Sequence, residues 1–167
     1  SKMDGYLKIK TKIDNKDVDK QIKQLEDKIK KMQTDISQGA KEQESLQMQI
    51  NQYEELANEA EEYRQTLKRL EKDRANMVKN DPNLVVSNTP QYTSLMTQID
   101  SIKQKYATAT KELDKQAPKI DKVYSKLEQV KAKQTENNAK IVQYRQEIEQ
   151  VNMQNMQKGI DNVGRSI

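Results

Sequence analysis

The sequence predicts an all-α fold: a long antiparallel helical hairpin of the coiled-coil type, preceded by one short N-terminal β-strand. Apolar residues recur at alternating steps of three and four along two tracks, which is the periodicity of a coiled-coil seam. One interruption that contains two prolines, residues 80–90, separates the two tracks. A short run near the N-terminus alternates with a period of two, as the residues of a strand do.

The composition limits both the core and the chemistry of the protein. Of its 167 residues, 33% are hydrophobic and 34% are charged, and none is Trp or Phe, so a thin seam is expected in place of a broad core. Disordered chains share such a composition but lack the periodicity. The chain has no cysteine and no histidine, which removes two common metal ligands and the usual acid–base group near neutral pH. We therefore expect no enzyme, no metal site, no cofactor and no small-molecule substrate.

The charges are interspersed along the chain. The 30 Lys and Arg residues face 26 Asp and Glu residues, and the two signs alternate along most of the sequence. This pattern is typical of a solvated helix surface, so nucleic acid is not expected as a partner. The uncharged stretch from Pro82 to Ile99 contains prolines, amides and hydroxyls and no long apolar block, so it is not expected to span a membrane.

Residues 1–16 are expected to form an N-terminal arm that contains the strand. Leu7, Ile9 and Ile13 alternate with lysines, which places the two kinds of residue on opposite faces. A single strand leaves backbone donors and acceptors unpaired, so we expect it to pair with the same segment of another copy or with a partner's sheet edge. These three residues are therefore candidates for an oligomer contact. The alternative is a disordered arm.

The first long helix is expected over residues 17–79, with Asn15 or Asp17 as its cap. In the half nearest the tip, a second apolar line widens the stripe beyond a two-helix seam. Two interpretations remain open: this line makes a third contact, or the seam shifts by three residues after Tyr53 and no longer runs through Arg64. The second line, a possible oligomer contact, consists of Leu56, Tyr63, Leu70 and Met77.

Residues 80–90 are expected to form the tip of the hairpin. Pro82 ends the first helix because it lacks a backbone donor, and Thr89 followed by Pro90 is a typical start for the next one. The uncharged residues of the tip either contact a partner or only cover the end of the hairpin. These possible tip contacts are Leu84, Val85 and Val86.

The second long helix is expected over residues 91–158, with a kink at Pro118, where a hydrogen bond is lost and the ring clashes with the preceding turn. The pattern weakens toward the C-terminus, and Gly159 and Gly164 punctuate a short amphipathic stretch. Residues 159–167 are therefore expected to be the truncated start of a further segment.

The two tracks can be paired in a register that sets Gly39 opposite Gln134, or in one that is slipped by a heptad. The first register brings Asp35 near Lys140, whereas the slipped register sets Lys28 against Lys140. Because register is decided by such differences, we predict the first one. The predicted coiled-coil core consists of Ile22, Leu25, Ile29, Met32, Ile36, Leu46, Ile50, Tyr53, Leu67, Ile99, Ile102, Tyr106, Leu113, Ile120, Val123, Leu127, Val130, Ile141, Tyr144 and Ile148.

Two segments carry a resemblance to a known family. The run Asp4-Gly5-Tyr6-Leu7-Lys8-Ile9-Lys10-Thr11-Lys12-Ile13-Asp14 leads into the helical pattern of residues 18–36, and a second run reads Gly159-Ile160-Asp161-Asn162-Val163-Gly164. This arrangement resembles the N-terminal region of tail tape measure proteins from phages and prophages of Gram-positive bacteria. In that family a strand of the form Asp-Gly-x-Ile/Leu-x-Ile-x-Thr-x-Ile-Asp precedes a lysine-rich helix.

The resemblance implies a structural role without catalysis. Tape measure proteins lie extended in the tail tube, set the length of the tail by their own length, and leave the tail ahead of the DNA during infection. The partners that it implies are other copies of the chain, the tail tube and the tail assembly proteins. The location that it implies is the virion tail, after assembly in the bacterial cytoplasm.

Two other classes of function are compatible with the residues. The first is a bacterial coiled-coil adaptor or secreted helical hairpin, cytoplasmic or secreted, that binds a protein or a membrane through its tip. The second is an enzyme that uses paired carboxylates. A solvent-facing helix offers no water-excluding pocket to shift their pKa values, which disfavours the enzyme. The carboxylates in question are Glu54, Glu55, Glu61 and Glu62.

Overall fold

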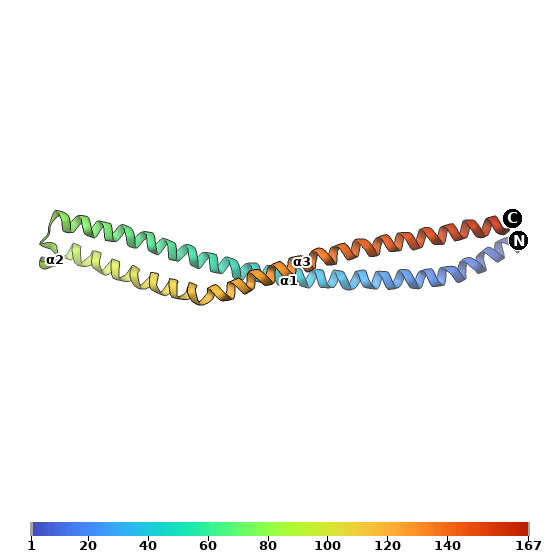
Figure 1. Ribbon diagram of the computed structural model, residues 1–167, viewed down its shortest axis with the longest axis horizontal. Coiled ribbons are helices and arrows are strands. Elements are labelled where there is room, and N and C mark those ends of the chain that lie inside the picture. Colours follow the sequence, from blue (N-terminus) through green and yellow to red (C-terminus); the bar gives the residue numbers. More distant parts are fainter. Residues whose placement is uncertain (1, 167) are drawn as a thin grey trace. The chain divides into compact units, whose positions relative to one another are not determined.

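The computed structural model describes the backbone of residues 2–166 and the side chains of residues 16–164. Within residues 2–166 the chain forms three helices and no strand (Figure 1). The helices are α1 (Lys2–Asn80), α2 (Leu84–Ser87) and α3 (Pro90–Ser166). The all-α class and the two long helices are therefore as the sequence predicts.

The chain divides into two compact units. One, here called the terminal unit, consists of Ser1–Gln43 and Glu128–Ile167, and the other, the tip unit, consists of Glu44–Leu127. Each unit contains one part of α1 and one part of α3, so each is a pair of helices with its own seam.

The predicted N-terminal strand is not shown. The helix α1 is assigned from Lys2, and the side chains of residues 1–15 are outside the part of the chain that the structure describes. The possible oligomer contact through Leu7, Ile9 and Ile13 lies outside the described residues and stays a prediction.

In the terminal unit, α1 and α3 pack in opposite directions. Leu25 of α1 lines a groove together with Val151 of α3, and farther along α1 the backbone at Gly39 approaches the side chain of Gln134. Residue numbers therefore rise on one helix as they fall on the other. The most buried described side chains of this unit are Leu25, Asn137 and Ile141.

In the tip unit the two long helices are also antiparallel, and α2 lies between them in the chain (Figure 1). Leu70 near the end of α1 lines a groove with Ile102, and the amino group of Lys103 lies 3.8 Å from a carboxylate oxygen of Glu71. The core of this unit consists of Leu46, Ile50, Ala60, Leu70, Tyr92, Ile99, Ala109, Ile120 and Leu127.

Local hydrogen bonds fix the turn between α1 and α3. The carboxylate of Asp81 accepts a bond of 3.2 Å from the N–H of Asn83, and the N–H of Asn88 donates to the carbonyl of Leu84 at 3.0 Å. Asn88 adopts φ 51°, in the left-handed region, which asparagine tolerates better than most residues. The hydroxyl of Thr89 then caps α3 by accepting a bond of 3.3 Å from the N–H of Tyr92.

The helix α3 differs from expectation at its C-terminal end. It runs through Pro118 without ending, and it continues past Gly159 to Ser166, where the sequence analysis expected a further segment to begin. No glycine has a positive φ among the described residues. Gly159 and Gly164 therefore do not adopt the left-handed conformation that glycine provides when it ends a helix.

Candidate interaction surfaces

All twenty predicted core residues lie buried or half-buried in the unit to which they belong. The heptad pattern alone therefore identified side chains that the helix pairing removes from solvent. The buried ones are Leu25, Leu46, Ile50, Ile99, Ile120, Leu127 and Ile141, and the half-buried ones are Ile22, Ile29, Met32, Ile36, Tyr53, Leu67, Ile102, Tyr106, Leu113, Val123, Val130, Tyr144 and Ile148.

In the tip unit, the seam on α1 lies where a three-residue shift would place it. Leu70 is only 7% exposed, whereas the side chain of Arg64 is 52% exposed and its guanidinium lies 2.7 Å from Glu61. Leu56 and Tyr63 line one groove with residues 101–112 of α3. The apolar line that could have made a third contact thus packs against this chain's own α3, with Met77 half-buried at its end.

A polar layer interrupts the seam of the terminal unit. The Nε2 atom of Gln134 donates a hydrogen bond of 2.7 Å to the backbone carbonyl of Ile36. A Cβ atom added to Gly39 would lie 2.6 Å from Cδ of Gln134 and 2.9 Å from its Nε2, so this glycine makes room for the glutamine. One turn away, Asn137 is 2% exposed, and its Oδ1 atom has no hydrogen-bond partner. The layer has the predicted register of Gly39 opposite Gln134.

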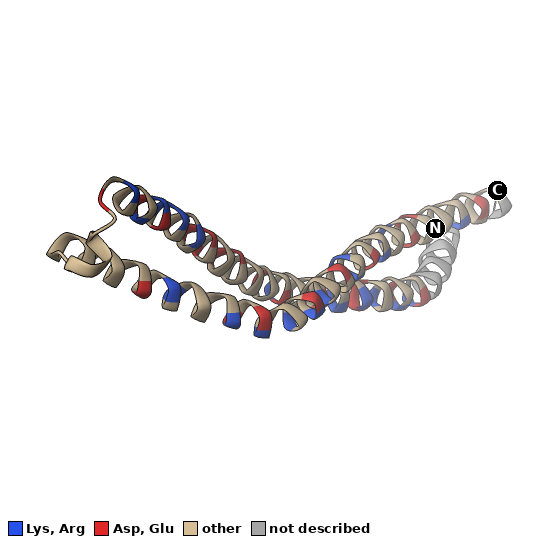
Figure 2. Cartoon of the chain, turned by 60° about the vertical axis from the view of Figure 1, so that its left-hand side comes forward, with Lys and Arg blue, Asp and Glu red and all other residues tan. Residues whose placement is uncertain are grey.

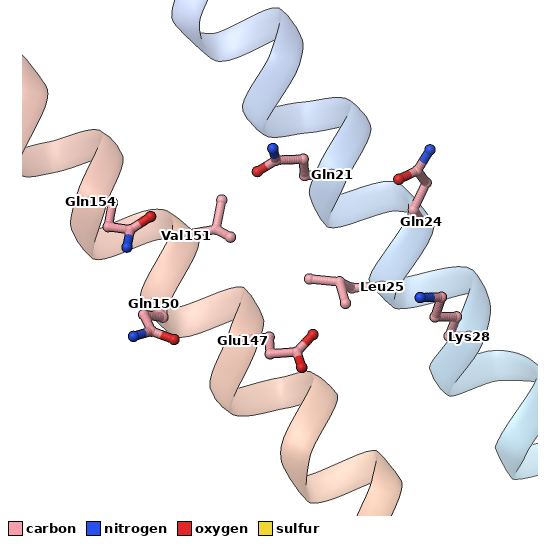
Figure 3. A pocket seen from close by; sticks show the side chains of 8 residues that line it. All are labelled: Gln21, Gln24, Leu25, Lys28, Glu147, Gln150, Val151 and Gln154. Carbon is pink, nitrogen blue, oxygen red and sulfur yellow. The ribbon is translucent and has the colours of Figure 1, made fainter.

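Farther toward the chain ends, the terminal unit has a groove of about 290 Å³ between α1 and α3. In Figure 3, Leu25 and Val151 point toward one another from the two helices, and glutamine and charged side chains surround them. Lys28 lies on the rim of this groove, with its amino group 5.6 Å from the centre of the Tyr144 ring. An exposed cation in that position contributes about 0.5–1 kcal/mol to the packing of the two helices.

The tip exposes two of its three apolar residues. Val86 is 87% exposed and Val85 is 54% exposed, whereas Leu84 is half-buried. Residues 82–99 carry no charged side chain, and Figure 2 shows α2 and the first turns of α3 free of charge. Leu84 therefore covers the end of the helix pair, while the two valines face solvent.

The four paired carboxylates are exposed to solvent, and one of them is bonded to a neighbouring arginine. A hydrogen bond from Arg64 holds the pKa of the Glu61 carboxyl below its usual range, so Glu61 is ionised near neutral pH and has no proton to donate. Glu54, Glu55 and Glu62 are exposed like Glu61. Among residues 16–164, no group of three or more acidic, cysteine or histidine side chains is placed to hold a metal ion.

Comparisons with protein-family models, with curated protein sequences and with solved structures found no match. None of the helices, over the part of the chain that the structure describes, is long and apolar enough to cross a bilayer.

An apolar stripe on the outer side of α3 in the terminal unit was predicted only in part, as the short amphipathic stretch near Gly159 and Gly164. Met153 and Met156 are each 69% exposed, and Ile160 is 63% exposed. The spacing of three and four from Met153 onward was the available signal, but it is out of phase with the seam that the heptad pattern follows.

Proposed function

We propose that the chain is a structural, non-catalytic coiled-coil segment of a phage tail tape measure protein. The observation that supports a structural role is that the predicted seam residues of both units are buried or half-buried where α1 pairs with α3. Positively and negatively charged residues are interspersed along both long helices (Figure 2). The tape measure assignment itself is supported by the resemblance of residues 4–14 and 159–164.

In this proposal the chain acts with other copies of itself and with the tail tube and tail assembly proteins, in the virion tail. Tape measure proteins convert chain length into tail length. A straight helix contributes about 1.5 Å per residue, and a helical hairpin contributes half of that because the chain returns on itself. The pairing of α1 and α3 within each unit favours the second value for this segment.

A matched deletion tests both the function and the hairpin. Residues 22–35 and 138–151 are two heptads each and face one another in the terminal unit, so their removal preserves the seam. In the full-length protein of the tail-bearing particle, we expect the mean tail length in electron micrographs to fall by about 21 Å for a hairpin and about 42 Å for straight helices. The control is Lys30→Gln, which leaves the chain length unchanged. Tails of unaltered length in the deletion variant would contradict a tape measure function.

A second candidate function is favoured by the exposure of Val85 and Val86 at the tip. In that case the chain is a bacterial coiled-coil adaptor or secreted hairpin that binds a protein or a membrane through the tip. Changing Leu84, Val85 and Val86 to serine is expected to abolish binding to liposomes or to a captured partner. Val142→Ser, at an exposed valine of the terminal unit, is the matched control. Equal binding by both variants would reject the tip as the contact.

A further inference from the structure

The outer stripe of α3 is defined by four residues with coiled-coil spacing. Met153 and Met156 are each 69% exposed, Ile160 is 63% exposed and Val163 is 39% exposed. The half-buried residues of the same segment are different ones: Val151, Asn155, Gly159 and Asn162. At 3.6 residues per turn, the two sets lie on different sides of the helix, with Val163 and Gly159 nearest to one another. The segment therefore has an inner face within the terminal unit and an outer apolar face in solvent.

Two glycines lie in this segment, Gly159 on the inner side and Gly164 beside the outer stripe, and among the described residues neither has a steric reason to be glycine. A Cβ atom added to Gly159 or to Gly164 would meet nothing within 4 Å, and neither glycine has a positive φ. A glycine in the interior of a helix costs stability relative to alanine. Because glycine has no side chain, it would let a second helix approach the outer stripe closely.

The charges around the stripe indicate which helix could approach. Residues 150–163 contain two charged side chains, Lys158 and Asp161, whereas ten of the residues 16–31 on α1 are charged. If α1 of another copy packed against the stripe, its charged side chains would lose solvation. The same stripe of another copy brings methionine, isoleucine and valine, flanked by the uncharged Asn152 and Gln157.

We propose that the outer stripe of α3 binds the same stripe of a second copy of this chain, with the two helices antiparallel around a twofold axis. In this arrangement Met156 meets Ile160 of the second copy, and Met153 meets its Val163, as a and d positions do in an antiparallel coiled coil. This inference goes beyond the proposed function and does not depend on it.

The direction of the pairing follows from Glu149. This glutamate lies one heptad before Met156, so it continues the stripe. A parallel pairing would set Glu149 against Glu149 of the second copy, and like charges at such positions oppose association. In the antiparallel pairing, the four apolar residues form the layers and the glutamates lie apart. With only four layers the interface is small, so the dimer is expected to be weak.

The first test is the mass of the full chain in solution by analytical ultracentrifugation between about 10 µM and 1 mM, the range in which a weak dimer of this size forms. We expect a concentration-dependent dimer, and we expect the double variant Met156→Lys/Ile160→Lys to weaken it by about 100-fold or more because the new charges lose solvation in the interface. The matched control is Met48→Lys, at a methionine of the tip unit that is 57% exposed. Circular dichroism shows that both variants keep their helix content. A wild-type chain that is monomeric throughout, or a dimer that the double variant does not weaken, would overturn the proposal.

The second test determines the direction of pairing. Because the chain has no cysteine, Met156→Cys and Ile160→Cys variants each carry a single thiol. In a buffer of reduced and oxidised glutathione, an equimolar mixture of the two variants is expected to form mainly the disulfide between the two different variants. A predominance of disulfides between identical chains would show parallel pairing and would overturn the antiparallel arrangement.

Discussion

The side-chain amide of Gln134 on α3 donates a hydrogen bond of 2.7 Å to the backbone carbonyl of Ile36 on α1. The bond crosses the seam of the terminal unit beside Gly39, where no side chain holds the glutamine away. Its acceptor is a backbone atom at one position of α1. A slip of the two helices along one another would therefore break the bond and would place a bulkier residue in contact with Gln134.

The pair Gly39 and Gln134 is expected to show strong energetic coupling. Gly39→Ala should gain about 1 kcal/mol of helix propensity and lose about 1 kcal/mol when the added Cβ displaces the Gln134 hydrogen bond. Its net effect on the wild type is then close to zero. In a Gln134→Ala background there is nothing to displace, so Gly39→Ala should stabilise the chain by about 1 kcal/mol. Urea unfolding followed by circular dichroism measures the effect of Gly39→Ala in both backgrounds. Equal effects in the two backgrounds would rule out the contact between Gly39 and Gln134.

Asn137 is expected to lower the free energy of unfolding of the protein and to define the register of α1 on α3. Its Oδ1 atom is buried without a donor, which costs about 1–3 kcal/mol. Asn137→Leu should therefore raise the free energy of unfolding by about 1–2 kcal/mol, since leucine removes the unpaired atom. The neighbouring Asn138→Leu, at an exposed position, is the control and should change little. A loss of stability in Asn137→Leu would mean that the amide has a partner, such as an internal water.

The sequence predicted the seam well because a heptad pattern depends only on local spacing. Ile50 and Ile99, both almost fully buried, stand at predicted seam positions. The register of Gly39 opposite Gln134 was also predicted, although the flanking charges on which that prediction rested are not a sufficient reason for it. Lys140, whose charge favoured that register, lies 3.0 Å from Glu136 of its own helix. Exposed ion pairs are weak and exchange partners, whereas the Gln134 side chain is half-buried and bonds to one backbone carbonyl of α1.

Other features could not be predicted from one chain's pattern. Arg64 and Tyr63 both fit a seam position, and only the packing of Leu70 against α3 shows which side faces inward. The first half of the outer stripe was overlooked because Met153 and Met156 lie out of phase with the inner seam. The continuation of α3 past Gly159 depends on the backbone conformation of a glycine, which the sequence leaves free.

Leu70→Ala tests the shifted seam of the tip unit. Leu70 is buried against α3, so its truncation should lower the free energy of unfolding by about 2–4 kcal/mol. Without the shift, Leu70 would lie beside the seam and its truncation would cost much less. Met48→Ala, at an exposed methionine of the same unit, should cost little. Similar costs for the two variants would argue against the shifted seam.

The pH dependence of stability is expected to include a contribution from Glu136. A hydrogen bond from Lys140 and the charges of Lys133 and Lys140 hold the pKa of the Glu136 carboxyl below its usual range. A carboxyl whose pKa is lowered by folding stabilises the protein above its unfolded pKa, and the effect is lost as the pH falls through the folded pKa. Glu136→Gln should therefore lower the melting temperature slightly at pH 7 and not at all near pH 2. A difference in melting temperature that persists at acid pH would show that the effect of Glu136→Gln comes from packing and not from the charge. The control is Glu128→Gln, at an exposed glutamate of α3.

Pro118 is expected to cost the protein stability within α3. It is exposed and lies inside the helix, where it removes a backbone hydrogen bond and its ring clashes with the preceding turn, together about 3 kcal/mol. Proline also restricts the unfolded chain, which offsets up to about 1 kcal/mol of that cost. Pro118→Ala should therefore raise the free energy of unfolding by about 2 kcal/mol, as measured by urea unfolding. The adjacent Lys119→Ala is the control and should have almost no effect, because Lys119 is exposed and alanine suits a helix equally well. Unchanged or lowered stability in Pro118→Ala would contradict this cost and would indicate that the local geometry at the proline is needed for the packing of α3 on α1 in the tip unit.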